Sequence, residues 1–218
     1  MITQASPPLN PRLISTRLAD SFAGLRRRSN GGFAPLAATA HAVRMAADRR
    51  PIYKLGVVDL GLENVALPNG DSLELAVIRH PGASAIVALD ERGDLAMLTQ
   101  YRHAIGGWHR EIPAGCRNGA ESPLDCATRE LQEETGLTAG RWDHLGAIVT
   151  IPSFCDERIE LFLARDLSTT DAHPEPDEFI RLEWMRLAEA LAMVRRGEII
   201  DAKTIAALFH VQELLGSD

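Results

Sequence analysis

The sequence marks both ends of one helix, and this helix limits the folds open to the chain. Ser122 is an N-cap residue, and Pro123 follows at the first helical position, where proline is favoured. Gly136 supplies the left-handed residue that commonly ends a helix. Between them, small and apolar side chains recur at the spacing of one narrow buried stripe, at Leu124, Ala127, Leu131 and Thr135. The spacing predicts a helix over 123–135 that packs one face on the rest of the protein.

Short runs with β character lie on both sides of this helix. Ser72–Arg79 alternates, and Ser84–Leu89 is the continuous apolar run of a buried strand. Asp94–Tyr101 follows after a turn, which predicts a hairpin with Ser84–Leu89, and a glycine-rich loop is expected over Gly106–Gly119. Later strands are expected at Leu145–Ile151, Arg158–Ala164 and Phe179–Met185, and helices at Leu187–Arg196 and Lys203–Leu215. This order predicts an α/β (α+β) fold in which helices cover a mixed sheet.

Composition excludes several classes of protein. Hydrophobic residues make up 45% of the 218 residues and charged residues 24%, as in ordinary globular proteins. The apolar runs are too short to cross a bilayer, so no membrane span is expected. The three cysteines form no CxxC pair, which argues against a disulfide framework and favours a reducing compartment, the cytoplasm. A net charge of −7 argues against a nucleic-acid partner.

The first fifty residues differ from the rest. They hold eight arginines, no lysine and only two acidic residues, Asp20 and Asp48. Three interpretations stay open for this leader: a transit peptide to a mitochondrion or other organelle, a disordered basic arm, or a segment without function that precedes a natural start at Met45. We expect a leader at 1–50 and one folded domain at 51–218.

Three glutamates crowd about one turn near the end of the helix. Glu130, Glu133 and Glu134 lie at i, i+3 and i+4, where like charges repel by a few tenths of a kcal/mol on an exposed helix. The helix dipole also disfavours anions at this end, and only Arg129 compensates nearby. A hard divalent cation would resolve the conflict, and carboxylates without Cys or His select Mg²⁺ or Mn²⁺. The alternative is a solvated acidic helix face.

The segment from Gly115 to Leu137 resembles the Nudix box, GX5EX7REUXEEXGU with U aliphatic, at every defined position. The matching residues are Gly115, Glu121, Arg129, Glu130, Leu131, Glu133, Glu134, Gly136 and Leu137. The resemblance implies a Nudix α/β/α sandwich, hydrolysis of a nucleoside diphosphate linked to another group, and an Arg129–Glu121 ion pair that orients the helix.

The resemblance also assigns roles to the carboxylates. It implies that Glu130 and Glu134 bind metal, that Glu133 is a ligand or a partner of one, and that the carbonyl of Ala114 is a further ligand. Metals held in this way can clamp a pyrophosphate and activate a water, which places Glu133 and Glu134 among the catalytic residues.

The flanks of the box resemble ADP-ribose pyrophosphatases and their nucleotide-sugar relatives. The resemblance rests on two segments, Gln100-Tyr101-Arg102 and Glu111-Ile112-Pro113-Ala114-Gly115. Arg102 could fork onto pyrophosphate oxygens, or be a surface arginine. Glu111 could bind ribose hydroxyls or metal, or be a strand-end charge, and Trp108 could stack on base or sugar, or be packing.

A downstream loop resembles the same branch. Pro152 lies fifteen residues beyond Leu137 and opens a loop over 152–157 that lacks the glycine of the family pattern. Glu157 in this loop is the candidate general base, with Glu133 as the second candidate and an ordinary turn acid as the alternative. The tail over 197–204 also resembles this branch and is interpreted as a fold marker.

Together these features predict a metal-dependent pyrophosphatase that splits ADP-ribose to AMP and ribose 5-phosphate. The alternatives are a preference for GDP-mannose and a Nudix-fold module that binds its ligand without cleaving it. The resemblance further implies a homodimer, which we place at residues 52–110 because the alternating strand Ser72–Arg79 would leave an uncovered edge.

Overall fold

A computed structural model describes residues 49–173 and 179–216 of the chain. The expected leader lies outside these residues, except for Arg49 and Arg50, which begin the first strand. In chain order the elements are β1 (Arg49–Leu55), β2 (Val58–Ala66), β3 (Ser72–Arg79), β4 (Ala83–Ala88), β5 (Asp94–Arg102), a 3-10 turn (His103–Ile105), β6 (Gly107–Glu111), β7 (Ala114–Cys116), α2 (Pro123–Thr135), β8 (Leu137–Val149), β9 (Arg158–Thr169), β10 (Ile180–Arg186), α3 (Leu187–Arg196) and α4 (Ala202–Gly216). All of them belong to one compact unit of the chain.

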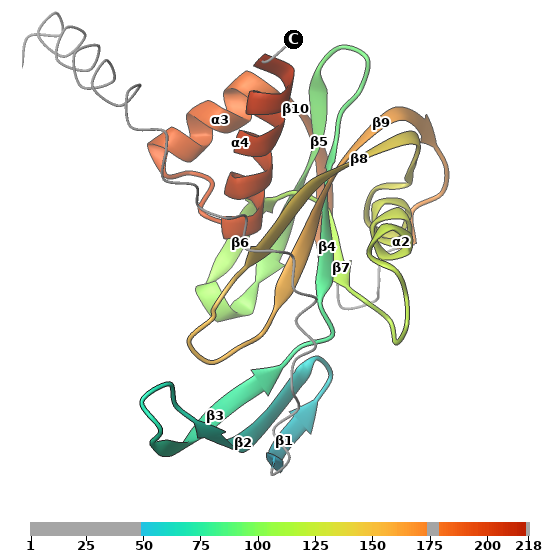
Figure 1. Cartoon of the computed structure of the whole chain (residues 1–218). Helices are drawn as coiled ribbons and strands as arrows, with labels where there is room; N and C mark the ends of the chain where they lie inside the picture. The colour runs from blue at the N-terminus through green and yellow to red at the C-terminus, as the bar shows by residue number, and fades with distance from the viewer. Residues whose placement is uncertain (1–48, 174–178, 217–218) are drawn as a thin grey trace, which may run out of the picture. The chain divides into compact units, whose positions relative to one another are not determined.

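The strands form three sheets, in the orders β1-β2-β3, β10-β5-β6 and β7-β4-β9-β8. Among the described strands, β4 and β9 pair in parallel and the other pairs are antiparallel. In Figure 1, α3 and α4 lie together on one side of the β4–β9 sheet, and α2 lies on the other side. The expected α/β (α+β) sandwich around a mixed sheet is therefore confirmed.

Strand β4 carries the centre of the core because its side chains are buried on both faces. Ala85 and Val87 pack in a cluster with residues of α3 and α4. Ile86 and Ala88 point the other way and pack in a second cluster with residues of α2. Burial on two faces explains why the segment is a continuous apolar run rather than an alternation.

The hairpin expected between the strands at Ser84–Leu89 and Asp94–Tyr101 is wrong. Strand β4 pairs with β7 and β9, whereas β5 pairs with β6 and β10 in another sheet. At the turn, a β-bridge between Leu89 and Leu95 and a hydrogen bond from the Asp90 N–H to the Asp94 carbonyl at 2.9 Å join the two segments. The turn residues specify a reversal of direction, but they do not specify that both strands stay in one sheet.

The glycine-rich segment Gly106–Gly119 was expected to be a loop, but it contains β6 and β7. Both strands are short, and they are held by pairing with β5 and β4. Tertiary pairing outweighs the weak strand propensity of this sequence.

Helix α2 has the expected ends. The Ser122 hydroxyl accepts a hydrogen bond from the Asp125 N–H at 3.1 Å. Gly136 has φ +65° and donates its N–H to the Gln132 carbonyl at 2.9 Å. The expected buried stripe is wrong at its first position, because Leu124 is 42% exposed. These caps fix both ends of the helix that carries the box glutamates.

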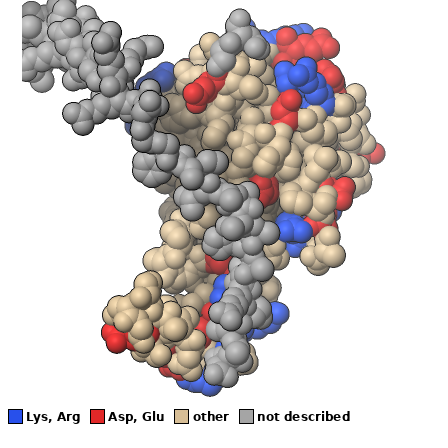
Figure 2. Space-filling view, in the orientation of Figure 1, with Lys and Arg blue, Asp and Glu red and all other residues tan. Residues whose placement is uncertain are grey.

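The β1–β3 sheet leaves many apolar side chains in solvent. Large exposed ones are Ile52, Tyr53, Leu55, Val57, Val58, Leu73 and Leu75. On the face drawn in Figure 2, charged side chains of this sheet lie mainly at its rim. Its last strand is joined to the loop before β9, since the N–H of Ile78 donates to the Phe154 carbonyl at 2.8 Å. Among the described residues, no helix is long and apolar enough to cross a membrane.

Candidate active site

A cleft of about 560 Å³ opens among β5, β7, α2, the loop after β8 and the start of α4. It brings together five of the residues that the sequence proposes for catalysis, substrate binding or metal binding. They are Arg102, Ala114, Glu130, Glu133 and Glu157. Residues from distant parts of the sequence therefore meet at one site.

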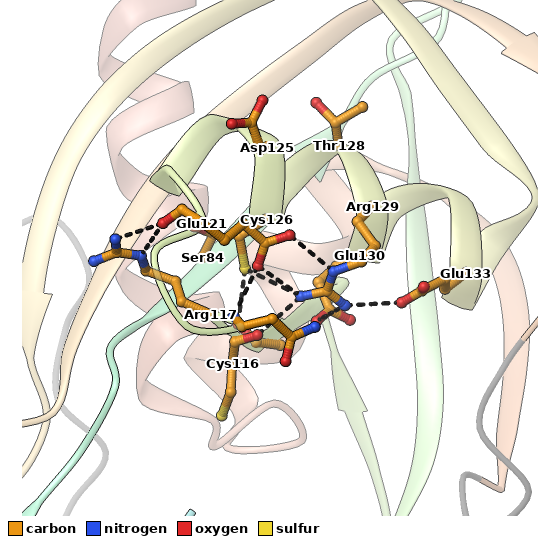
Figure 3. A network of polar contacts seen from close by, with 12 residues as sticks. Ser84, Cys116, Arg117, Glu121, Asp125, Cys126, Thr128, Arg129, Glu130 and Glu133 are labelled. Carbon is orange, nitrogen blue, oxygen red and sulfur yellow. Dashed lines mark hydrogen bonds and ion pairs between the residues drawn. The ribbon is translucent and has the colours of Figure 1, made fainter.

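Arg129 lies at the centre of the box and contacts three glutamates (Figure 3). Its Nε donates to Glu121 Oε1 at 2.9 Å. Its Nη1 donates to Glu130 Oε1 at 2.6 Å and to Glu133 Oε2 at 2.8 Å. Its Nη2 donates to the Cys116 carbonyl at 2.9 Å, which joins the helix to β7. The Arg129 side chain thus holds three carboxylates together and links them to β7.

The ion pair between Arg129 and Glu121 is present as expected. Hydrogen bonds from Arg129 and the N–H of Asn118 lower the pKa of Glu121 to about 2, although desolvation opposes the change. The hydrogen bond to Glu121, together with those to Glu133 and Glu130, raises the pKa of Arg129. Glu121 therefore stays ionised and holds the loop before α2 against the helix.

Two of the box glutamates, Glu130 and Glu134, are less exposed than a solvated acidic face would be. Glu130 is 7% exposed and Glu134 5% exposed. A Cβ added at Gly115 would lie 2.1 Å from the Glu130 carboxylate, so any larger residue here would force that carboxylate to move. Glu134 lies behind the wall of the cleft, where Oε2 accepts the Ala114 N–H at 2.9 Å.

Glu157 lies in the loop before β9 and lines the cleft. Its Oε2 accepts a hydrogen bond from the Thr150 hydroxyl at 2.5 Å. Its Oε1 is 3.5 Å from Nε2 of His80, a ring that also lies 3.6 Å from the Cys116 sulfur. Because His80 Nδ1 accepts the N–H of Gly82 at 3.1 Å, the neutral ring carries its proton on Nε2, facing Glu157. The carboxylate is therefore oriented from two sides.

The fork of Arg102, expected on a pyrophosphate, is bound to Glu111 instead. Nε and Nη2 of Arg102 donate to the two carboxylate oxygens at 3.0 and 2.9 Å. Lys203 Nζ donates to the same carboxylate at 2.6 Å. Burial alone would raise the pKa of Glu111, but these two cations lower that pKa to about 2. Glu111 is 3% exposed and lies behind Arg102, so Arg102 rather than Glu111 faces the cleft.

The sequence profile of the NUDIX domain matches residues 78–208. The chain belongs to the Nudix family. It is 38% identical over 166 residues to the ADP-ribose pyrophosphatase of Bacillus subtilis (strain 168), with 75% of this chain and 90% of that protein covered. It is 39% identical over 153 residues to the ADP-ribose pyrophosphatase of Mycobacterium tuberculosis, with 68% and 73% covered.

A solved structure, "Crystal structure of ADP compounds hydrolase", has the same fold with a TM-score of 0.68 at 19% identity. The likeness covers 78% of this chain and 93% of that chain. It supports the Nudix fold described above.

The Nudix box offers oxygen donors of the kind that hard divalent cations prefer. Glu130 and Glu133 line the cleft, and Arg129 donates a hydrogen bond to each of them. Within 49–173 and 179–216, no three His, Cys, Asp or Glu side chains already form a group that could hold a metal ion. Arg129 bridges Glu130 and Glu133, and Glu134 is bound to backbone, which explains why the carboxylates do not converge. Their chemistry fits a hard divalent cation.

Trp108 is not brought to the Nudix cleft. It lies on β6, 47% exposed, with its ring edge-on to Tyr101 at 5.8 Å. The Arg181 guanidinium lies 4.7 Å over the Trp108 ring. The contacts of the Trp108 ring in the structure are therefore with Tyr101 and Arg181.

The sequence did not identify several residues of this Nudix site. They are His80, Thr150, Asp201 and Lys203. The segment 197–204 resembles the ADP-ribose branch, and this was the one available signal for Asp201 and Lys203. His80 and Thr150 carry no local pattern that separates them from ordinary strand-end residues.

Proposed function

We propose that the protein hydrolyses the pyrophosphate bond of ADP-ribose and releases AMP and ribose 5-phosphate. One observation carries the proposal: a single cleft is lined by the box carboxylates of Glu130 and Glu133, by cationic side chains that include Arg102, and by a carboxylate from a separate loop, that of Glu157. Two relatives at 38% and 39% identity, both ADP-ribose pyrophosphatases, support the choice of substrate.

Mg²⁺ or Mn²⁺ is the proposed cofactor, held by Glu130, Glu133, Glu134 and the carbonyl of Ala114. Such an ion neutralises charge on the pyrophosphate and makes a bound water more acidic. Arg129 donates to Glu133 Oε2 at 2.8 Å, so Glu133 would bind such an ion while this arginine holds its carboxylate in place. Glu121 holds Arg129 in turn, by hydrogen bonds of 2.9 and 3.1 Å to the guanidinium.

Glu157 is the proposed general base. Its carboxylate takes a proton from the attacking water while the water oxygen bonds to phosphorus and the bridging P–O bond breaks. The Thr150 hydroxyl and His80 hold the carboxylate in place for this step. Glu133, which also lines the cleft, is the second candidate.

Arg102 is the proposed anion-binding group. Among the described residues, its Nε and Nη2 donate to Glu111, and its Nη1 makes no hydrogen bond. That nitrogen is free to donate to a phosphate oxygen. Glu111 thereby contributes to substrate binding by holding Arg102 in place.

A panel of ADP-ribose, GDP-mannose, ADP-glucose and NADH, with Mg²⁺ and a phosphatase that releases phosphate from the products, tests the function. We expect the highest kcat/KM for ADP-ribose. A higher value for GDP-mannose would move the assignment to that substrate. Binding of ADP-ribose without phosphate release would show a binding module instead.

A cytoplasmic homodimer is the proposed state of the protein. The support is the exposed apolar surface of the β1–β3 sheet, which a second copy would bury. Light scattering on the full chain of 23.8 kDa tests this, with a mass of about twice that value expected. A fully active monomer would contradict the proposal.

A further inference from the structure

Lys203 is a nearly buried cation on the wall of the cleft, in the first turn of α4. Only 9% of the residue is exposed. Its Nζ donates to Glu111 Oε2 at 2.6 Å and to Asp201 Oδ1 at 3.0 Å. A buried ammonium is costly unless it is paired, so both carboxylates are needed to keep it charged.

Lys203 in turn offsets the repulsion between its two partner carboxylates. Glu111 and Asp201 both direct an oxygen at the same ammonium nitrogen, so their charges face each other across Lys203. Glu111 at the same time holds Arg102 with both of its oxygens. The four side chains carry two positive and two negative charges, and loss of Lys203 would leave two carboxylates in mutual repulsion with one cation.

The backbone around this group is fixed. Asp201 Oδ2 accepts the Thr204 N–H at 2.9 Å and caps α4. The Thr204 hydroxyl in turn accepts the Ile112 N–H at 3.0 Å, which ties α4 to the residue after β6. Asp201 and Glu111 therefore cannot move apart easily if Lys203 is removed.

We propose that Lys203 is a positioning residue for substrate binding: it holds Glu111 in the orientation that clamps Arg102 toward the cleft. This inference rests on the proposed function, in which Arg102 binds the pyrophosphate. Without Lys203, Glu111 takes up a proton or turns from Asp201, and in either case the clamp on Arg102 loosens. The expected defect is in substrate binding, because the hydrogen bonds of Lys203 go to Glu111, which holds Arg102, and to Asp201.

Steady-state kinetics of full-length K203M, K203R and the double variant D201N/K203M with ADP-ribose and Mg²⁺ test the proposal. K203M should raise KM at least about tenfold and leave kcat within about threefold. K203R keeps the charge and should stay within about threefold of the parent in KM. D201N/K203M removes the opposing carboxylate while asparagine still caps the helix, so KM should fall back toward the parent value.

A purely structural role for Lys203 would make the double variant at least as defective as K203M, and that result would overturn the proposal. A KM for K203M within about twofold of the parent would also overturn it. K203Q replaces K203M if the latter does not fold.

A measurement that does not depend on enzymatic turnover can test this inference separately from the proposed function. Carboxylate NMR titration should give a higher pKa for Glu111 in K203M than in the parent, in which it is about 2. If the parent protein fails to hydrolyse ADP-ribose, the proposed function is wrong, and this titration still decides whether Lys203 controls Glu111. An unchanged Glu111 pKa would overturn the inference.

Discussion

The two ends of the cleft balance charge in different ways. At the box end, one arginine faces three carboxylates, those of Glu121, Glu130 and Glu133. At the α4 end, Arg102 and Lys203 face as many carboxylates as there are cations. The first end has an excess of negative charge that favours an added cation, and the second end is already neutral. Substitutions at the first end should therefore affect chemistry, and those at the second should affect binding.

The largest effect is expected for Glu134→Gln. It removes one charge from the proposed metal site, while the amide oxygen can still accept the Ala114 N–H, so the fold should hold. We expect turnover to be abolished, with kcat at saturating Mg²⁺ at least about 10⁴-fold lower, about 5.4 kcal/mol of barrier. E91Q, the same change at an exposed turn, is the matched control. A fall of less than about tenfold would rule out Glu134 as a metal ligand.

Glu157→Gln should come next. Loss of a general base lowers kcat by about 10² to 10⁴. The affinity for Mg²⁺, measured by titration of activity, should change little because Glu157 lies on a different loop from the box. Normal kcat in this variant would move the base to Glu133.

A glycine substitution tests how tightly the box end is packed. Gly115→Ala places a Cβ 2.1 Å from the Glu130 carboxylate, which must then move. We expect a loss of about 1–3 kcal/mol in the free energy of unfolding, measured by urea denaturation, together with reduced activity. Gly140→Ala is the control, since its Cβ would meet Asp166 at an ordinary 3.4 Å. Equal effects of the two changes would contradict the close approach.

The smallest effect is expected for Glu121→Gln, and it depends on pH. The pKa of Glu121 falls from an ordinary 4.5 to about 2 because of its contact with Arg129. A carboxyl with a lowered pKa stabilises the fold above its unfolded value and loses that contribution as pH falls through the folded value. The melting temperature of E121Q should therefore lie below that of the parent above pH 4.5, and the gap should close toward pH 2. A gap that is independent of pH would contradict the ion pair.

The box and the mixed fold could be predicted because their signals are local. Helix caps, the spacing of the glutamates and the Arg129–Glu121 pair all lie within one segment of the sequence. The β4–β5 hairpin was wrong because a turn does not reveal which sheet each strand joins. Lys203 was missed because its partner Glu111 is 92 residues away, and nothing near either residue indicates the contact.

The parallel pairing of β4 with β9 has a consequence for how the protein forms. These strands flank the whole box segment in the sequence, so their hydrogen bonds close a long loop. Contacts between residues that are distant in the chain slow folding, because loop entropy is lost before the contacts stabilise the structure. During synthesis, β4 leaves the ribosome with two apolar faces and must wait for β9. The order of the strands thus makes the assembly of the cleft a late event, and it exposes β4 to wrong pairing until then.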